Sequence, residues 1–382
     1  MSKKVINIGM LGFGSMGKTH SYAVSNFKFF MNDLPFEAKI SGVCTTSIEK
    51  SNSVCEKYGF DIATVNEDDL INNPTIDVID VCTPNIYHYE TLKKSIAAGK
   101  HIYCEKPLCV SATQAFEIAK MAEKSEKIHN IVFNNRFLAP IQRAKQIIDE
   151  GKLGRIISFN ASYLHSSAVL TSKKAGWKQN KDICGGGVLF DLGSHVIDLI
   201  YHLCGPFSEV NTLTQIAYKE RTGMDGAPWM TNADEAFYML AKLENGAYGT
   251  ISASKVAVGA NDDIILDVYG KKGSLKFSLM DCNWLHFYDN SEADSPLGGN
   301  KGYTKIECVG RYPEPQGLFP SPKASSGWLR GHVSSMFNFL NSVYTGVQTS
   351  PDFNDAAYVQ SVMASAYNSA ESGLWTKVEK NI

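Results

Sequence analysis

Short apolar runs alternate with amphipathic stretches over the first third of the chain. Buried strands are expected for four of these runs, at 5–10, 38–44, 78–82 and 101–104. Between them, residues 16–27 and 89–98 carry the apolar spacing of helices. Strands that alternate with helices are typical of a parallel sheet covered by helices on both faces. The pattern predicts a doubly wound α/β domain.

The pattern changes near residue 155, where strand-like runs follow one another directly. Six strands are expected, at 156–164, 209–217, 234–243, 247–255, 264–269 and 274–278. Turn signals such as Asn245-Gly246 separate them, and amphipathic helices are expected at 331–344 and 355–372. We predict a dinucleotide-binding domain over 1–130. We predict a substrate-binding and oligomerisation domain over 131–382, of α+β class, with a large, open, mostly antiparallel sheet.

The segment 289–328 is rich in Gly, Pro and Ser and has no clear periodicity. Three interpretations remain open: a lid over the substrate, an arm across a subunit boundary, or a mobile insertion.

Composition narrows the class of protein. The 382 residues carry 37 basic and 39 acidic side chains, which leaves no electrostatic footprint for nucleic acid or an anionic membrane. The nine cysteines contain no C-x-x-C pair, which is typical of free thiols in a reducing compartment. The N-terminus has no signal-peptide pattern, and no apolar run approaches a membrane span of about 18–20 residues. We expect a cytoplasmic protein with neither nucleic-acid nor membrane partners.

The first motif with chemistry follows the first predicted strand and opens the first predicted helix. It reads Gly12-Phe13-Gly14-Ser15-Met16-Gly17. In this context the three glycines are the fingerprint of a dinucleotide site: a tight turn, a close approach to the pyrophosphate, and close helix–strand packing. A glycine turn without a ligand is the alternative, and the position at the first strand of the alternating pattern disfavours it.

The end of the second predicted strand bears on the choice between NAD and NADP. An acid usually grips the ribose there, but this chain has Thr45 and Thr46, with Lys50 nearby. A carboxylate would repel a 2′-phosphate, whereas hydroxyls and a lysine would not. The sequence therefore tilts slightly toward NADP, although the hydroxyls could serve either ribose.

Two further strand ends carry polar residues. One continues into Thr83-Pro84-Asn85 and His88, and the other into Glu105-Lys106-Pro107. Ligands bind beyond the carboxyl ends of strands in open α/β sheets, so we expect these residues at the cofactor edge. Glu105 is either the charge partner of Lys106 or a structural acid tied to the backbone.

The stretch 188–203 is predicted to be an amphipathic helix behind the triple glycine 185–187. Its polar face carries Asp191, His195, Asp198 and His202. The alternatives are a solvated face and a metal site, but no H-E-x-x-H or cysteine set supports a metal, and none is expected. We favour His195 as the group that exchanges a proton with a substrate hydroxyl, with Asp191 orienting it or the substrate. His202 is expected to be structural.

Three further residues are candidates for the pocket. Trp177 is either an ordinary core or loop tryptophan or an aromatic wall for the sugar or the nicotinamide. Tyr163 and His165 lie near the end of a predicted strand, as does the stretch 230–233, and are expected to contact substrate.

Taken together, these motifs resemble the glucose–fructose oxidoreductase / inositol dehydrogenase / rhizopine catabolism (Gfo/Idh/MocA) family along nearly the whole chain. The resemblance rests on Gly12 to Gly17 with His20, Cys82 to Asn85 with His88, Glu105-Lys106-Pro107, Asn135-Arg136-Phe137, Gly185 to Asp198, and Tyr367 to Gly373. It implies NAD(P)-dependent oxidation or reduction of a sugar, cyclitol or related carbonyl.

By the same resemblance, Lys106, Asp191 and His195 form the catalytic group, and Glu105, Arg136 and Trp177 join the cofactor contacts. The chain departs from the family at Thr45-Thr46, where Asp or Ser-Arg is common, and in the segment 289–328.

Three functions remain in view: an ordinary dehydrogenase or reductase, a redox-neutral enzyme that recycles tightly held cofactor, and a non-enzymatic cofactor or sugar sensor. A sensor has no need of all three catalytic residues. Predicted strands such as Ile264-Ile265-Leu266 carry apolar residues toward both faces of their sheet. We therefore expect a homodimer or homotetramer that covers the second face, as the resemblance also implies.

Overall fold

The computed structural model describes residues 3–31, 33–321, 323–325 and 327–380. The chain forms two compact units. The first contains residues 1–134, 310–324 and 329–357, and the second contains 135–309, 325–328 and 358–382. The predicted boundary at residue 130 placed all later residues in the second domain. In the structure, almost all of helix α9 (Trp328–Thr345) belongs to the first unit. The reason is burial, because the apolar side of α9, including Val333, Met336 and Leu340, belongs to the first unit's core.

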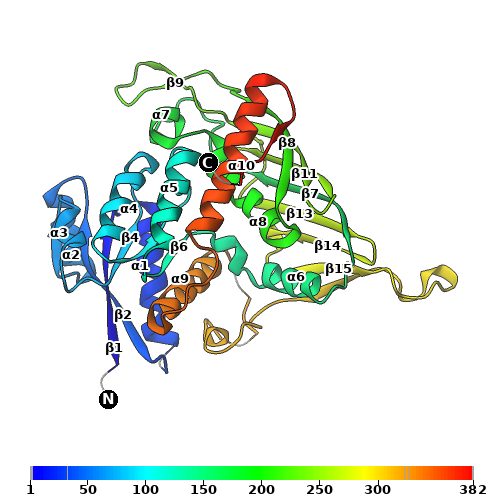
Figure 1. The fold of residues 1–382 in the computed structure, drawn as a ribbon, viewed down its shortest axis with the longest axis horizontal. Coiled ribbons are helices and arrows are strands. Elements are labelled where there is room, and N and C mark those ends of the chain that lie inside the picture. Colours follow the sequence, from blue (N-terminus) through cyan, green and yellow to red (C-terminus); the bar gives the residue numbers. More distant parts are fainter. Residues whose placement is uncertain (1–2, 32, 322, 326, 381–382) are drawn as a thin grey trace. The chain divides into compact units, whose positions relative to one another are not determined.

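The first unit is built on a six-stranded parallel sheet in the order β3-β2-β1-β4-β5-β6 (Figure 1). The strands are β1 (Lys4–Leu11), β2 (Phe36–Cys44), β3 (Ile62–Thr64), β4 (Val78–Val81), β5 (His101–Cys104) and β6 (His129–Ile131). The helices between them are α1 (Ser15–Phe30), α2 (Ile48–Tyr58), α3 (Asp68–Ile71), α4 (His88–Ala97) and α5 (Ala112–Glu123). This is the doubly wound strand order of dinucleotide-binding domains, as predicted.

The second unit is built on a nine-stranded sheet in the order β16-β15-β14-β13-β7-β12-β11-β8-β17 (Figure 1). The predicted strands appear as β7 (Ile156–Leu164), β8 (Phe207–Gln215), β11 (Ala236–Leu243), β12 (Tyr248–Ser254), β13 (Asp263–Gly270) and β14 (Gly273–Ser278). The sequence did not indicate β15 (Trp284–Asp289), β16 (Tyr303–Glu307), β17 (Thr376–Lys377) or the separate hairpin of β9 (Glu220–Thr222) and β10 (Pro228–Met230). Every pairing in the large sheet is antiparallel except β12 with β7. The predicted mostly antiparallel sheet is confirmed.

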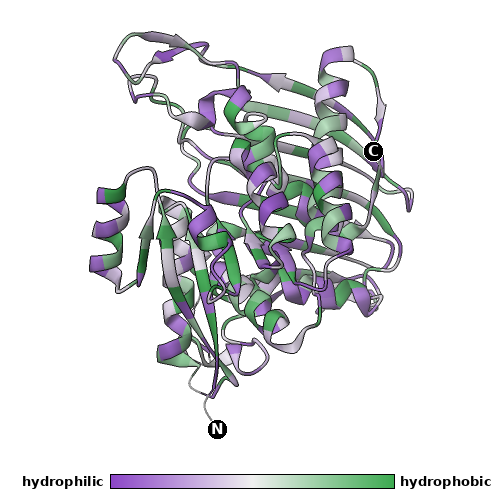
Figure 2. Ribbon diagram, turned by 60° about the vertical axis from the view of Figure 1, so that its left-hand side comes forward, coloured by the Kyte–Doolittle hydropathy of each residue, from purple (hydrophilic) through white to green (hydrophobic). Residues whose placement is uncertain are grey.

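One face of this sheet is packed and the other is open. Helices α6 (Ala139–Asp149) and α8 (Ser194–Cys204) contact β14, β15 and β7, and α10 (Phe353–Ser372) is tied to β8 by the Ser369 hydroxyl. On β13, Ile264 and Leu266 are buried, whereas Ile265 between them is 37% exposed. The strand register places Ile265 on the same face as Leu213, Tyr238, Leu240 and Tyr248, all of them exposed. Figure 2, coloured by hydropathy, shows both apolar (green) and polar (purple) residues along the strands of the large sheet.

The segment 289–328 is divided between the two units. Its β16 pairs with β15 and extends the large sheet, whereas residues 310–324 belong to the first unit. There Phe319 is buried with its ring 5.1 Å from that of Phe30. Both stretches are therefore paired or packed within their own unit, and the lid, arm and mobile-insertion interpretations of the segment stay predictions.

One helical stretch, Lys181–Cys204, is long and apolar enough by composition to cross a membrane. The sequence prediction that no run approaches such a span overlooked it. In the structure 83% of its most apolar window is buried inside the protein, which is the usual state of a core helix.

Candidate active site

In the glycine loop of the first unit, each of the three glycines has a different environment, which matches its predicted role. Gly12 has φ +90°, and a Cβ on it would lie 2.7 Å from the carbonyl oxygen of Cys82. A Cβ on Gly17 would lie 2.5 Å from the carbonyl oxygen of Gly12, so this glycine permits the close packing of α1 on β1. A Cβ on Gly14 would meet no atom within 4 Å. The loop therefore leaves open space where the fingerprint requires a pyrophosphate.

Helix α1 begins directly behind this open space, at Ser15 and Met16, and has no acidic residue in its first turn. Its N-terminal amides suit an anionic ligand. Phe13, predicted to contact the cofactor, is only 5% exposed, and its ring packs 5.3 Å from that of Tyr58, so its side chain is engaged within the protein.

At the end of β2, one predicted contact is corrected. Thr45 is 8% exposed, and its hydroxyl lies 2.8 Å from the hydroxyl of Ser51 and donates to the carbonyl oxygen of Ser47. It secures the start of α2 and is not free to bind a ribose. Thr46 and Lys50 are exposed and remain candidates for that contact.

At the end of β4, the prediction for His88 is also corrected. His88 is fully buried, and its two ring nitrogens lie 2.9 Å from the carbonyl oxygen of Thr83 and 3.0 Å from that of Pro107. Burial lowers the pKa of His88. The residue ties the loop after β4 to the loop after β5. Thr83 and Pro84 are half-buried at the strand end, and Asn85 is buried.

Glu105 is a structural acid in this arrangement. One carboxylate oxygen accepts a hydrogen bond from the backbone N–H of Lys106 at 3.2 Å, and the other lies 3.2 Å from Nε2 of His20. Burial alone would raise the pKa of Glu105, but the close contact and charge of His20, with the charge of Lys106, lower it to about 2. The carboxylate therefore serves to hold the loop that carries Lys106.

Asp191 and His195 both belong to the second unit. Asp191 lies in a π-helical turn, Leu189–Gly193, which continues directly into α8, where His195 lies. Asp234 fixes the entry to this turn, because its carboxylate accepts hydrogen bonds from the backbone N–H groups of Gly187 and Leu189, each at 3.0 Å. A Cβ on Gly187 would lie 2.1 Å from the carbonyl oxygen of Asp234, which explains the glycine.

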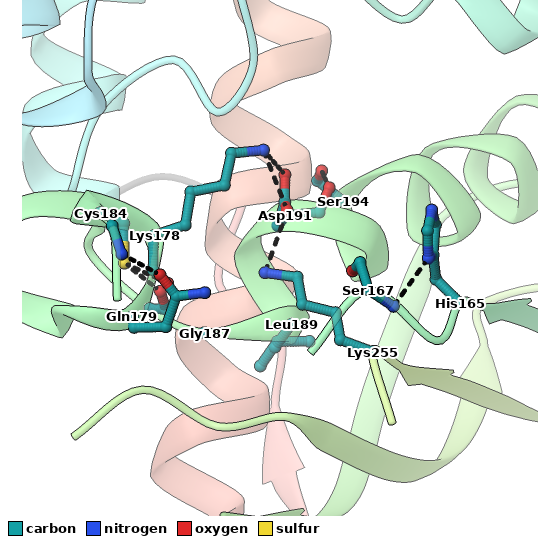
Figure 3. A network of polar contacts seen from close by, with 12 residues as sticks. His165, Ser167, Lys178, Gln179, Cys184, Gly187, Leu189, Asp191, Ser194 and Lys255 are labelled. Atoms are coloured by element: carbon teal, nitrogen blue, oxygen red, sulfur yellow. Dashed lines mark hydrogen bonds and ion pairs between the residues drawn. The ribbon is translucent and has the colours of Figure 1, made fainter. Parts of the chain in front are cut away.

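Asp191 projects from the π turn between two lysines (Figure 3). Its carboxylate oxygens lie 3.0 Å from Nζ of Lys178 and 3.0 Å from Nζ of Lys255. The Lys255 side chain is 10% exposed, whereas that of Lys178 is 48% exposed. The sequence analysis missed both lysines, since neither lies in a local motif: Lys178 lies 13 residues before Asp191, and Lys255 comes from a distant part of the chain.

His195 lies one turn farther on and is 8% exposed. The ring of Tyr163 packs against it edge-on at 5.9 Å, and the Tyr163 hydroxyl donates to Asp262 at 2.5 Å. Burial, followed by the charges of Asp262 and Asp191, raises the pKa of Tyr163. His165 is half-buried, and its Nδ1 accepts the backbone N–H of Ser167 at 3.0 Å (Figure 3). Tyr163 thus links His195, which its ring contacts, to Asp191, whose charge acts on its hydroxyl.

Asp198, on the same predicted polar face of the helix, is not solvated. Asp198 is 1% exposed and pairs with Arg136 through contacts of 2.6, 2.9 and 3.0 Å. The prediction that Arg136 contacts the cofactor is therefore corrected: its guanidinium forms a buried clamp on α8. Trp177 is 37% exposed in the turn Trp177–Gln179, which excludes a core role.

One group of possible metal ligands occurs among the described residues: His20, Asp80 and Cys82, with ligand atoms within 4.8 Å of one another. Two of these atoms already bond directly, since Nδ1 of His20 lies 2.9 Å from the Asp80 carboxylate. The absence of a metal stays a prediction.

Comparison with protein families agrees with this arrangement. Residues 6–133 match the model of an oxidoreductase family with an NAD-binding Rossmann fold, and residues 141–276 match the C-terminal domain model of the same family. The chain belongs to the Gfo/Idh/MocA oxidoreductase family. The open glycine cradle is thus the NAD-binding region of an oxidoreductase.

Curated relatives extend over almost the full length. Levoglucosan dehydrogenase of Pseudarthrobacter phenanthrenivorans is 28% identical, with 98% of each chain covered. D-glucoside 3-dehydrogenase of Escherichia coli is 26% identical over 99% of each chain. scyllo-Inositol 2-dehydrogenase (NADP(+)) of Bacillus subtilis is 31% identical, over 72% of this chain and 69% of that one.

Among solved structures, a levoglucosan dehydrogenase in complex with NADH and levoglucosan superposes with a TM-score of 0.93 at 28% identity. It covers 99% of this chain and 100% of its own. The fold and the family are therefore shared over the whole length.

Proposed function

We propose that this oxidoreductase transfers a hydride between a nicotinamide cofactor and a secondary alcohol or ketone of a sugar, cyclitol or related polyol. The observation that carries the proposal is the polar group of Asp191, Tyr163 and His195. Such a group can orient a hydroxyl and accept its proton. The similarity to enzymes named for levoglucosan, D-glucoside and scyllo-inositol supports a sugar-like substrate.

The chemistry divides between the cofactor and the protein. A bound nicotinamide supplies the hydride acceptor or donor. In the oxidative direction the substrate carbon loses a hydride and its hydroxyl loses a proton, so the product is a ketone. His195 takes this proton, Lys106 polarises the oxygen or relays the proton, and Asp191 holds the geometry.

The residues of the first unit fit the dinucleotide. The space beside Gly14 and the amides at the start of α1 would hold the pyrophosphate. Thr46 and Lys50 would face the adenosine ribose, and Thr83 and Pro84 would line the strand end.

The cofactor preference gives one testable prediction. Because no acid stands directly at the end of β2 and Lys50 is exposed, we expect NADP to bind at least as tightly as NAD. Thr46→Asp is expected to shift the preference toward NAD, because a carboxylate there repels a 2′-phosphate and can accept from the ribose hydroxyls. Calorimetric titration of both proteins with both cofactors measures the shift. Far tighter binding of NAD by the unaltered protein would contradict the lean to NADP.

A spectrophotometric screen tests the reaction itself. Sugars, cyclitols and keto-sugars are offered with NAD, NADP and their reduced forms, and absorbance is followed at 340 nm. Turnover of at least one sugar-like substrate is expected. No turnover, with cofactor that exchanges freely, would contradict the proposal. Cofactor that survives purification and recycles without net reduction would favour the redox-neutral alternative.

We further propose that the protein is a cytoplasmic homo-oligomer. None of the nine cysteines, all of them among the described residues, forms a disulfide, which fits a reducing compartment. Leu213, Tyr238, Leu240 and Tyr248 are 66, 55, 49 and 58% exposed on the open face of the large sheet.

A large exposed apolar face favours self-association, and a two-fold contact between copies would cover it. We therefore expect a dimer or tetramer by light scattering at micromolar concentration. Leu240→Lys is expected to shift the mass toward 42 kDa, while Lys271→Glu, away from this apolar set, leaves it unchanged. A 42 kDa monomer for the unaltered protein would contradict the prediction.

A further inference from the structure

Three ionisable side chains form a continuous buried line in the first unit. His20 of α1 lies between Asp80 of β4 and Glu105 at the end of β5. Its Nδ1 lies 2.9 and 3.0 Å from the two Asp80 oxygens, and its Nε2 lies 3.2 Å from Glu105. His20 and Asp80 are each 1% exposed, and Glu105 is 7% exposed. The His20 imidazole and the carboxylates of Asp80 and Glu105 have no direct role in the dinucleotide fingerprint or in the proton and hydride transfer proposed above.

The electrostatics of this line favour an imidazolium between two carboxylates. Burial alone would lower the pKa of His20, but the Asp80 carboxylate raises it well above 6.5. His332 of α9, whose ring lies 6.2 Å from that of His20, has its pKa lowered to about 3 by burial and by the His20 charge, and is therefore neutral. The remaining neighbours are Cys82 and Tyr103, whose pKa values burial raises, and the cation Lys106.

The line ends on the backbone of Lys106. The Glu105 oxygen that does not face His20 accepts the Lys106 backbone N–H at 3.2 Å. On the other side of Lys106, the carbonyl oxygen of Pro107 is bonded by His88. The peptide that carries the Lys106 side chain is thus anchored from both sides, once through Glu105 and once through His88.

We propose that His20 is a positioning residue for the reaction: clamped by Asp80, it fixes the Glu105 carboxylate and thereby the backbone from which Lys106 reaches the substrate oxygen. This inference rests on the proposed function only for the role of Lys106. A purely structural histidine would contribute to stability without affecting that lysine. The two roles are therefore separable by experiment.

The test compares His20→Gln with His129→Gln. His129 is another buried histidine of the same sheet, 3% exposed on β6, and is not part of the line. Both variants are expected to lower the melting temperature. Only His20→Gln is expected to lower kcat, on the order of 10–100-fold, since small misplacements of a reacting group have effects of this size. The KM for sugar and the affinity for cofactor should change less than about threefold.

Two measurements separate a positioning role of His20 from a purely structural one: the pH dependence of kcat and the resonance of the Lys106 amide. Loss of stability alone would change neither. Without the cation, Glu105 loses the main cause of its low pKa, so kcat of His20→Gln should acquire an additional acidic limb above pH 4.5, absent from His129→Gln. In protein labelled with ¹⁵N-lysine, the Lys106 amide resonance, assigned with Lys106→Arg, should shift in His20→Gln and stay in place in His129→Gln. Ring ¹⁵N shifts of His20 should report an imidazolium at pH 7.

A second variant covers the possibility that His20→Gln does not fold. His20→Gln combined with Asp80→Asn removes one buried carboxylate together with the cation, and should still show the lowered kcat and the shifted amide. An unmoved Lys106 amide, a neutral His20 at pH 7, or one equivalent of tightly bound metal would overturn the positioning role. Unchanged turnover in Lys106→Ala, with the amide shift present in His20→Gln, would instead reject the proposed function of Lys106 and leave the anchoring intact.

Discussion

Replacing His195 with alanine is expected to lower turnover by about 10²–10⁴, the usual contribution of a positioned general acid–base group. His195 is 8% exposed and packs against Tyr163, so the truncation removes the proton acceptor without adding a charge. Cofactor binding should largely survive, because the dinucleotide fingerprint lies in the other unit. Lys106→Ala is expected to cause a loss of the same size. Steady-state rates across pH 6–9, on the substrate found by screening, measure both effects.

His202→Ala serves as the control for this experiment. It lies near the C-terminal end of α8, is only half-buried, and is expected to retain turnover within a few-fold of the unaltered protein. Near-normal turnover in both His195→Ala and Lys106→Ala, at every pH, would remove these two residues from the mechanism.

The second large effect concerns Gly14→Val, which is expected to abolish dinucleotide binding in a folded protein. A Cβ at Gly14 meets no protein atom within 4 Å, and its φ of −82° is accessible to any residue. The added side chain therefore costs the fold little and occupies only the space that the pyrophosphate needs. We expect calorimetry to show a loss of affinity of at least about 100-fold, or about 2.8 kcal/mol.

Gly302→Val is the matched control, because a Cβ there also meets no atom within 4 Å. Both variants should melt close to the unaltered protein, and only Gly14→Val should lose cofactor. Gly17→Ala is the opposite case: its Cβ would lie 2.5 Å from the Gly12 carbonyl oxygen, so it should lower the melting temperature. Retained affinity in a folded Gly14→Val protein would place the cofactor elsewhere.

Much of the architecture was predictable because it depends on local periodicity. Alternating apolar runs and helical spacing identified four strands of the parallel sheet near the glycine loop. Successive strand-like runs separated by turn signals identified β7, β8 and β11 to β14. The strands β15 and β16 were missed, since β16 is an edge strand with four of its five residues exposed and carries no apolar alternation.

The candidate site divides in the same way. Sequence predicted where Gly14, Lys106, Asp191 and His195 lie in the chain's elements, because turn geometry, strand ends and helical spacing are properties of neighbouring residues. Their roles in the reaction stay predictions. It misplaced His88, Arg136 and Thr45, whose side chains are occupied by Pro107, Asp198 and Ser51 respectively. It also missed Lys255 beside Asp191.

By itself, then, the amino-acid sequence determined the two sheet classes and the glycine cradle, and it supplied the candidates for the reacting residues, all of which follow from short-range spacing. Tertiary structure alone decided the partners of the polar side chains. His20 meets Asp80 from 60 residues away, and Arg136 meets Asp198 from 62. Such pairs carry no local signal, because burial and charge select them only after distant segments have packed together.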